Sequence, residues 1–303
     1  MTVLPTAVPG RPPRWLLVLA AIGGALLLIV AVTRWGTPSD EYAYWLAAKR
    51  LLAGQPLYDP TAQPGTPYAY FYPPPLAQVL GPFTIVIPDA VYVAAWTGLL
   101  LVCLWWLAGR SPLVALALVA FIPVAVELWY RNVHLVLGVL VVLGLRRSPA
   151  WLAVAAAIKG APGLGLLYFV AARRYRDALV MGGVGAAMLA LSVAVSPGAW
   201  REFLDVVVAD AAGVGASILP IPFAVRAVAA VALVIVAGLL TGRATRGPVA
   251  GARAGWMHDP RSGEVLFVVA LILANPTFWV TSLSLLVAVV PLLRTPPEPS
   301  RGD

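Results

Sequence analysis

The clearest pattern in the sequence is a succession of long apolar runs separated by short polar segments. The first run covers residues 15–33, about 28 Å of helix at 1.5 Å per residue, which matches the hydrocarbon thickness of a bilayer. Further runs lie at 89–108, 112–128, 135–145, 150–172, 178–196, 219–241, 265–274 and 278–293. Because a lipid-exposed backbone must satisfy its own hydrogen bonds, these runs predict an all-α, polytopic membrane protein. A cleaved signal peptide is the alternative for the first run, but no small-residue cleavage site follows it, so a membrane anchor is favoured.

The distribution of basic residues predicts the orientation of the runs. If the run at 150–172 is a hairpin of two short helices turning near Lys159 and Pro162, about ten helices cross and both termini are cytosolic. Most of the 21 lysines and arginines then fall on the cytosolic side. This count requires the proline-rich segment 72–88 to enter and leave on the outer face as a re-entrant helix. We therefore expect a multi-pass protein of the plasma membrane.

Composition supports this class and removes several others. The chain is 61% hydrophobic and 11% charged, with a mean hydropathy of +0.88, which excludes a soluble enzyme. The net charge of +8 follows from topology and needs no nucleic-acid partner. Cys103 is the single cysteine, so no disulfide forms within the chain. We expect one membrane domain over 1–303, with an outer loop at 34–88, a cytosolic loop at 242–263 and a flexible tail at 295–303.

The first outer loop contains the densest polar chemistry. Ser39 is a predicted N-cap, Asp40 and Glu41 occupy the first helical turn, and Gly54 ends the helix about four turns later. Apolar and aromatic residues recur at helical spacing, so we expect this helix to lie in the membrane interface. A purely structural reading remains open, in which the two acids complement the helix dipole.

Other ionisable residues converge on the same face under this topology. Glu127, Arg131 and His134 flank one outer hairpin, Lys159 lies at the turn of another, and Arg201 begins the second outer loop. Each residue has an ordinary explanation, such as an i, i+4 ion pair between Glu127 and Arg131. Their convergence is informative because ionisable groups at a membrane edge are costly and usually functional.

A carboxylate surrounded by cations and tyrosines suits group transfer from a phosphate-bearing lipid. The cations would hold the phosphate leaving group, and the carboxylate would take a proton from an acceptor hydroxyl. The sequence has no P-loop, no dinucleotide-binding glycine pattern and no metal-ligand spacing, so we expect neither a nucleotide nor any other cofactor, and no metal. A transporter or lipid flippase is the alternative, because broken helices and intramembrane charges are typical of transporters as well.

Four stretches resemble glycosyltransferase family 87. Residues 39–59 have an Asp at the start of a helix that ends in Leu51-Leu52-Ala53-Gly54 and then Tyr58, and Tyr72-Pro73-Pro74 opens the re-entrant segment. Arg131-Asn132 and residues 157–162 resemble two further stretches of the family, so the resemblance extends from 15 to about 176. One departure is Tyr130-Arg131-Asn132-Val133-His134, where Gly-Gln-x-Asn is common in the family.

The resemblance implies a GT-C fold and a sugar donor, mannose, carried on polyprenyl phosphate and used on the extracytoplasmic face. It implies that Asp40 is the general base of an inverting transfer to a glycolipid or lipoglycan acceptor. Lys159, Arg131 and Arg201 are then candidates for binding the donor phosphate, and Tyr70 and Tyr72 for stacking on a sugar. The remaining candidates are Asn132 and His134 as donor ligands, and Glu41 and Glu127 as auxiliary acids.

Overall fold

The computed structural model describes residues 14–33, 39–59, 68–212, 217–244 and 259–294, and these residues form helices and connections without strands. The tail at 295–303, positions 245–258 of the predicted cytosolic loop, and positions 34–38 and 60–67 of the outer loop lie outside the described residues. The elements are α1 (Arg14–Thr33), α2 (Asp40–Leu52), α3 (Pro74–Leu80), α4 (Phe83–Val86), α5 (Asp89–Leu107), α6 (Pro112–Val119), α7 (Ile122–Tyr130), α8 (His134–Arg146), α9 (Ala150–Ile158), η1 (Ala161–Leu164), α10 (Gly165–Ala171), α11 (Tyr175–Val195), α12 (Pro197–Ala212), α13 (Phe223–Ala244), α14 (Pro260–Leu273), η3 (Val280–Ala288) and α15 (Val289–Arg294).

Four of these helices, α1, α5, α11 and α13, are long and apolar enough to cross a bilayer. Their bounds agree with four of the predicted apolar runs to within a few residues. A fifth span is possible if α6 and α7 cross together. The structure therefore confirms an all-α membrane protein, whereas the expected number of about ten crossings is not confirmed.

The predicted run at 112–128 is not one straight helix, which corrects the sequence interpretation. It is divided into α6 and α7, whose axes are bent by 89°. Pro123 lies in the first turn of α7. Proline lacks the N–H that would continue the helix and its ring collides with the preceding turn, so the chain changes direction there.

The interrupted run at 150–172 folds as the expected hairpin. Arg146, just before α9, and Arg174, just after α10, both lie within electrostatic range of Glu264. The start of α9 and the end of α10 therefore lie on the same side of the molecule. The turn around Lys159 and Gly160 lies at the opposite end, where α9 gives way to the 3-10 helix η1.

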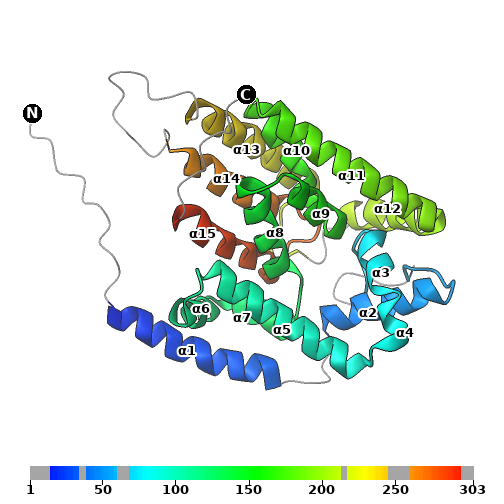
Figure 1. Cartoon of the computed structure of the whole chain (residues 1–303), viewed down its shortest axis with the longest axis horizontal. Helices are drawn as coiled ribbons and strands as arrows, with labels where there is room; N and C mark the ends of the chain where they lie inside the picture. Colours follow the sequence, from blue (N-terminus) through cyan, green and yellow to red (C-terminus); the bar gives the residue numbers. More distant parts are fainter. Residues whose placement is uncertain (1–13, 34–38, 60–67, 213–216, 245–258, 295–303) are drawn as a thin grey trace, which may run out of the picture.

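The α8 helix lies in the middle of the molecule (Figure 1). It begins at His134, one of the candidate site residues. Nine of its 13 residues are buried, and the helix packs against α5, α9 and η3. At 1.5 Å per residue it spans only about 20 Å, less than a bilayer core. Its N-terminus, His134, therefore lies inside the protein, next to the hairpin turn that holds Lys159.

The segment after Tyr72 also has the short length that a re-entrant helix needs. The stretch Pro74–Val86 is apolar but shorter than a span, and Gly81 and Pro82 separate α3 from α4. Ile85 and Val86 of α4 are among the most exposed apolar side chains of the described residues, at 72% and 74%. An apolar surface of this kind is suited to lipid.

One face of α2 binds Asp89 at the start of α5, and the location of this helix in the membrane interface stays a prediction. Tyr42 Oη, Trp45 Nε1 and Lys49 Nζ donate to this carboxylate at 3.3, 2.8 and 2.6 Å. The i, i+3, i+7 spacing of these residues places their three donors around one carboxylate. The helix ends as predicted, with Gly54 at a φ of +66°.

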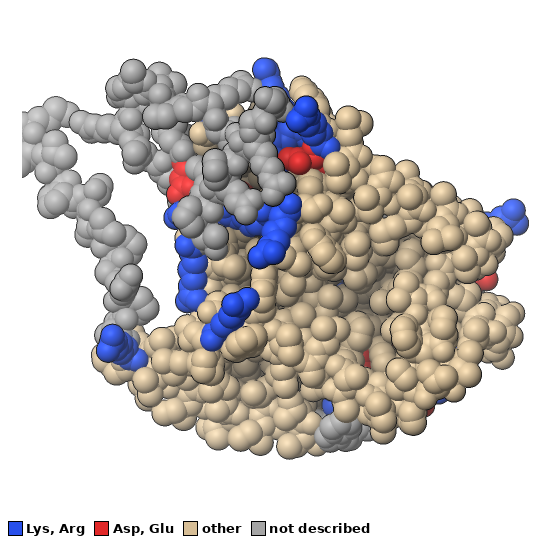
Figure 2. All heavy atoms as spheres, in the orientation of Figure 1, with Lys and Arg blue, Asp and Glu red and all other residues tan. Residues whose placement is uncertain are grey.

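Basic residues gather at the end of the molecule away from α2 and α12, on the face drawn in Figure 2. Several helix ends are joined there. Arg146 donates to Glu264 at 2.6 Å and to the carbonyl of Leu292 at 2.9 Å, and Arg294 donates to the carbonyl of Ala108 at 2.9 Å. The molecule thus has a basic end, and it lies away from the acidic residues Asp40 and Glu41 at the start of α2.

Candidate active site

Asp40 and Glu41 are adjacent in sequence but point to different surroundings. Successive residues of a helix are about 100° apart, so the first turn of α2 directs the two carboxylates into separate environments. Asp40 is partly exposed and its carboxylate accepts a hydrogen bond from the side-chain amide of Asn132. Glu41 is fully buried and forms an ion pair with Arg131, with 3.2 Å between Oε1 and the guanidinium.

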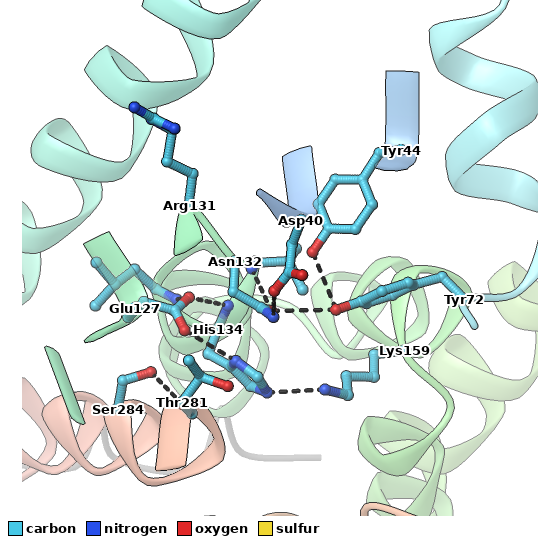
Figure 3. A network of polar contacts seen from close by, with 12 residues as sticks. Asp40, Tyr44, Tyr72, Glu127, Arg131, Asn132, His134, Lys159, Thr281 and Ser284 are labelled. Carbon is cyan, nitrogen blue, oxygen red and sulfur yellow. Dashed lines mark hydrogen bonds and ion pairs between the residues drawn. The ribbon is translucent and has the colours of Figure 1, made fainter. Parts of the chain in front are cut away.

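The amide of Asn132 is held in one orientation by its other contacts. Its Oδ1 accepts from the backbone N–H of Val133 at 2.7 Å and from the hydroxyl of Tyr72 at 3.1 Å. Tyr72 in turn accepts from the hydroxyl of Tyr44 at 3.0 Å. Because an amide oxygen that accepts two donors must point toward them, the NH₂ group of Asn132 faces Asp40. Figure 3 shows this chain of polar contacts converging on Asp40.

The environment of Asp40 favours its protonated form more than water does. Burial raises the pKa of Asp40 from 3.8 to about 6, and the hydrogen bond from Asn132 and the charge of Lys159 partly oppose this shift. A carboxylate with a pKa near 6 is a stronger base than an ordinary aspartate and is still mainly ionised at neutral pH. Asp40 as a whole residue is partly exposed, unlike its fully buried neighbour Glu41.

Lys159 lies opposite Asp40, at the turn between α9 and η1. Its Nζ is 2.8 Å from Nε2 of His134 and 5.5 Å from the centre of the Tyr72 ring. His134 is supported from behind by Glu127, with Nδ1 of the ring 3.1 Å from Oε2. The lysine ammonium is thus held between an imidazole and an aromatic ring, and it lies within electrostatic range of Asp40.

Glu127 and Arg131 do not form the i, i+4 ion pair that their spacing suggested. Arg131 ends α7 in the left-handed region, with a φ of +50°, so its side chain leaves the helical register. It pairs with Glu41 and points away from Asp40 in Figure 3, while its backbone carbonyl accepts from Trp96 Nε1 at 2.9 Å. Glu127 instead accepts from the backbone N–H groups of His134 and Leu135 at the start of α8.

We call the surroundings of Asp40, Tyr72, Asn132, His134 and Lys159 the Asp40 pocket. Tyr70 borders it, with 5.7 Å between the ring centres of Tyr70 and Tyr72. Tyr70 is buried, and its hydroxyl donates to the carbonyl of Pro73 at 2.9 Å. Arg201 is exposed on α12. Its neighbour Glu202 accepts from the backbone N–H groups of Leu57 and Tyr58, at 2.8 and 3.2 Å. Glu202 therefore fastens the loop that follows α2.

Two contributors to the pocket were missed from the sequence. Tyr44 supports Tyr72, and its position four residues after Asp40, on the same helix face, was an available signal. Ser284 of η3 lies beside Glu127 and donates to the carbonyl of Thr281 at 2.6 Å. The hydroxyl residues within the apolar run at 278–293 were the corresponding signal there. In the part of the chain with assigned placement, no group of three His, Cys, Asp or Glu side chains could hold a metal ion.

Comparison with known families identifies the class of protein. A family model described as glycosyltransferase family 87 matches residues 70–296, which is well over half of the chain. The chain belongs to glycosyltransferase family 87. As a family 87 member it is a membrane glycosyltransferase, and the transporter alternative is set aside. No curated protein and no solved structure matches the chain.

The extent of the family 87 match differs from the resemblance read from the sequence. It continues to residue 296, far beyond 176, where the recognisable motifs ended. It begins at residue 70, so it includes Tyr72, Asn132, His134 and Lys159 but not Asp40. The connection between Asp40 and the matched region is therefore geometric, through its hydrogen bond with Asn132.

Proposed function

We propose that this protein transfers a hexose, mannose, from a polyprenyl-phosphate carrier to a hydroxyl group of a glycolipid or lipoglycan, with inversion at the anomeric carbon. The observation that carries the proposal is a partly exposed carboxylate, Asp40, hydrogen-bonded by Asn132 and opposed by the Lys159 ammonium. Membership of family 87 supplies the reaction class. The identities of the sugar, the carrier and the acceptor are part of the proposal.

The reaction requires a base on one side of the sugar and a cation on the other. Asp40 takes the proton of the acceptor hydroxyl as the hydroxyl oxygen forms its bond to the anomeric carbon. The bond between that carbon and the phosphate oxygen breaks, and its electron pair leaves with the polyprenyl phosphate. Lys159 stabilises the negative charge that develops on this leaving group. Asn132 keeps Asp40 oriented, and Tyr72 is placed to contact the sugar.

The other candidate residues support the pocket at a distance. Arg131 and Glu41 fix the first turn of α2 through their buried ion pair, and Tyr70 fixes the backbone around Pro73. Arg201 is a candidate for a contact with a bulky acceptor or donor outside the pocket, because it is exposed on α12.

A lipid-linked donor is favoured by the surface next to the pocket. Tyr72 contacts Asn132 and directly precedes α3 and α4, whose apolar side chains Val79, Ile85 and Val86 are exposed. A polyprenyl chain lying along such a surface would bring its phosphate toward Lys159. A nucleotide sugar would need a soluble binding domain, and the described helices are mainly apolar.

We propose that the pocket opens to the extracytoplasmic face of the plasma membrane. The basic end in Figure 2, where Arg146 and Arg294 bind neighbouring helix ends, lies away from α2 and would face the cytosol. Positive residues near helix ends are retained on the cytosolic side during insertion. Both termini are then cytosolic, and the acceptor is a component of the cell envelope.

The test is transfer of labelled sugar by purified protein in detergent. Polyprenyl-phosphate mannose, polyprenyl-phosphate glucose and GDP-mannose are each supplied with extracted membrane lipids. We expect a labelled glycolipid from polyprenyl-phosphate mannose with the wild type and with Asp205→Asn, an exposed aspartate of α12, but not with Asp40→Asn. Equal transfer by Asp40→Asn would refute the assignment of the base. Transfer only from GDP-mannose would refute the lipid carrier.

A further inference from the structure

Lys159 is connected to a buried carboxylate through a histidine, and the mechanism above leaves this arrangement unused. Glu127 and His134 are exposed by 0% and 1%, and they come from α7 and α8. His134 places one ring nitrogen 3.1 Å from Glu127 and the other 2.8 Å from Lys159. The three side chains form a line that ends at the Asp40 pocket (Figure 3).

When Lys159 is charged, only one position of the His134 ring proton satisfies the donors and acceptors of these three side chains. A lysine ammonium donates hydrogen bonds and cannot accept them, so Nε2 of His134 must present its lone pair. The proton of the neutral ring is then on Nδ1, which donates to Oε2 of Glu127. Oε1 of Glu127 accepts from the backbone N–H groups of His134 and Leu135 at 2.6 and 3.3 Å, as expected of an ionised carboxylate.

We propose that Glu127 and His134 are positioning residues that fix the Lys159 ammonium beside Tyr72 and opposite Asp40. Glu127 sets the tautomer of His134, and His134 directs one N–H of Lys159 away from the pocket so that the others point into it. The role of the held ammonium as a phosphate ligand rests on the proposed function. The tautomer of His134 does not, because it follows from the contacts and from the charge of Lys159.

Glu127→Gln separates this proposal from simple packing. Glutamine has nearly the same shape, but one of its two oxygens is replaced by a donor NH₂ group. The amide oxygen must face the backbone N–H groups of His134 and Leu135, so the NH₂ group faces Nδ1. Nδ1 then has to accept, the ring proton moves to Nε2, and an N–H points at the lysine ammonium. A carboxylate-to-amide change that reverses a histidine tautomer in this way disables a catalytic site while its geometry remains intact.

Replacing His134 itself gives a matched pair of variants. In His134→Gln the side-chain amide reaches the position of Nε2 and retains an acceptor for Lys159. In His134→Asn the shorter amide reaches only the position of Nδ1 and leaves Lys159 without that acceptor. We expect His134→Gln to keep at least tenfold more transfer activity than His134→Asn at equal amounts of folded protein. Equal losses in the two variants would contradict a positioning role.

The direct test is nitrogen-15 NMR of ring-labelled histidine in purified protein, with activity measured on the same samples. The chain has two histidines, so His258→Gln leaves His134 as the only signal. We expect a neutral ring protonated at Nδ1 in this background, and a ring protonated at Nε2 when Glu127→Gln is added. The proposal would be overturned if the ring of His134 were protonated at both nitrogens, or if its proton were on Nε2 while Glu127 is intact. It would also be overturned if Glu127→Gln left the position of the proton unchanged.

The two measurements also separate this proposal from the proposed function. If the tautomer reverses as expected but no donor supports transfer, the support of Lys159 stands and the proposed reaction is wrong. If transfer occurs from the lipid donor but the tautomer does not reverse, the reaction stands and the support is wrong.

Discussion

The first turn of α2 separates two polar regions that differ in nearly every physical respect. On one side, Asp40 is partly exposed, touches Asn132 and faces Lys159 across the pocket. On the other side, Glu41 is fully buried and is neutralised by Arg131, with Ser39 donating to the same carboxylate at 2.9 Å. Adjacent acids thus serve one region that is open to a ligand and one that is closed.

The difference teaches how the fold keeps a reactive carboxylate in place. A buried ion pair is costly to break, because removing one partner leaves the other charge uncompensated. The Glu41–Arg131 pair therefore anchors the start of α2 against the end of α7. Asp40 forms no ion pair of this kind with the described residues, and its raised pKa, about 6, reflects burial that disfavours its charge. We therefore expect substitutions of Glu41 to change stability and substitutions of Asp40 to change the proposed reaction.

The largest effect is expected from Asp40→Asn. Removing the base should lower transfer roughly 100- to 10,000-fold, the usual range for general base catalysis. Asparagine keeps the shape of the side chain and can still accept from Asn132, so the fold should persist. Initial rates with a lipid-linked donor measure the effect, with Asp205→Asn as the matched control. A loss below tenfold would show that Asp40 is not the base.

Lys159→Met should have the next largest effect, because it removes the charge and keeps the length of the side chain. We expect a decrease of about 100- to 1,000-fold in kcat, as for the loss of one strong donor to a developing negative charge. Lys159→Arg should recover part of the activity. A change confined to KM, with kcat unchanged, would mean that Lys159 only binds the donor.

Glu41→Gln should affect stability instead of chemistry. The change leaves Arg131 without its charged partner in a buried site and should cost about 3 kcal/mol in the free energy of unfolding. Asp40→Asn should instead raise the free energy of unfolding above pH 6. The pKa of Asp40 is raised in the folded state, so its ionisation destabilises the folded wild-type protein, and asparagine does not ionise. Thermal unfolding in detergent at pH 7.5 measures both. Equal shifts of the same sign would refute the distinction between the two regions.

The pH dependence of the reaction should follow the ionisation of Asp40. With a pKa of about 6, the carboxylate is the active form above that pH and is progressively protonated below it. We expect kcat/KM to fall about tenfold between pH 7 and pH 5. A rate that is constant down to pH 5 would mean that the working base has an ordinary aspartate pKa.

The smallest effect is expected from Arg201→Ala. Arg201 is exposed on α12, outside both regions, so its removal should change transfer from a small lipid donor less than about twofold. The same substitution in the assay with extracted acceptors tests the remaining role proposed for it. A loss comparable to that of Lys159→Met would place Arg201 in the pocket.

Much of the architecture could be predicted because it follows from local patterns. The apolar runs located α1, α5, α11 and α13, and the proline and glycine after Lys159 located the hairpin turn. The resemblance to family 87 pointed to Asp40, Asn132 and Lys159, which do come together around one pocket.

The remaining features depend on contacts that local patterns do not contain. Helical spacing suggested a pair between Glu127 and Arg131, but the left-handed backbone at Arg131 ends α7. Arg131 then pairs with Glu41, far away in sequence, and Glu127 binds the start of the next helix, α8. In the same way, the stripe of Tyr42, Trp45 and Lys49 suits a membrane interface as well as a protein surface. Their shared contact with Asp89 at the start of α5 could not be predicted from that spacing.

The most direct test of the account is the release of polyprenyl phosphate from labelled polyprenyl-phosphate mannose by three purified proteins: the wild type, Asp40→Asn and Glu41→Gln. The account predicts release with the wild type, release with the Glu41→Gln protein that remains folded, and a loss of at least 100-fold with Asp40→Asn. Equal release by the wild type and Asp40→Asn, or a selective loss with Glu41→Gln, would contradict it.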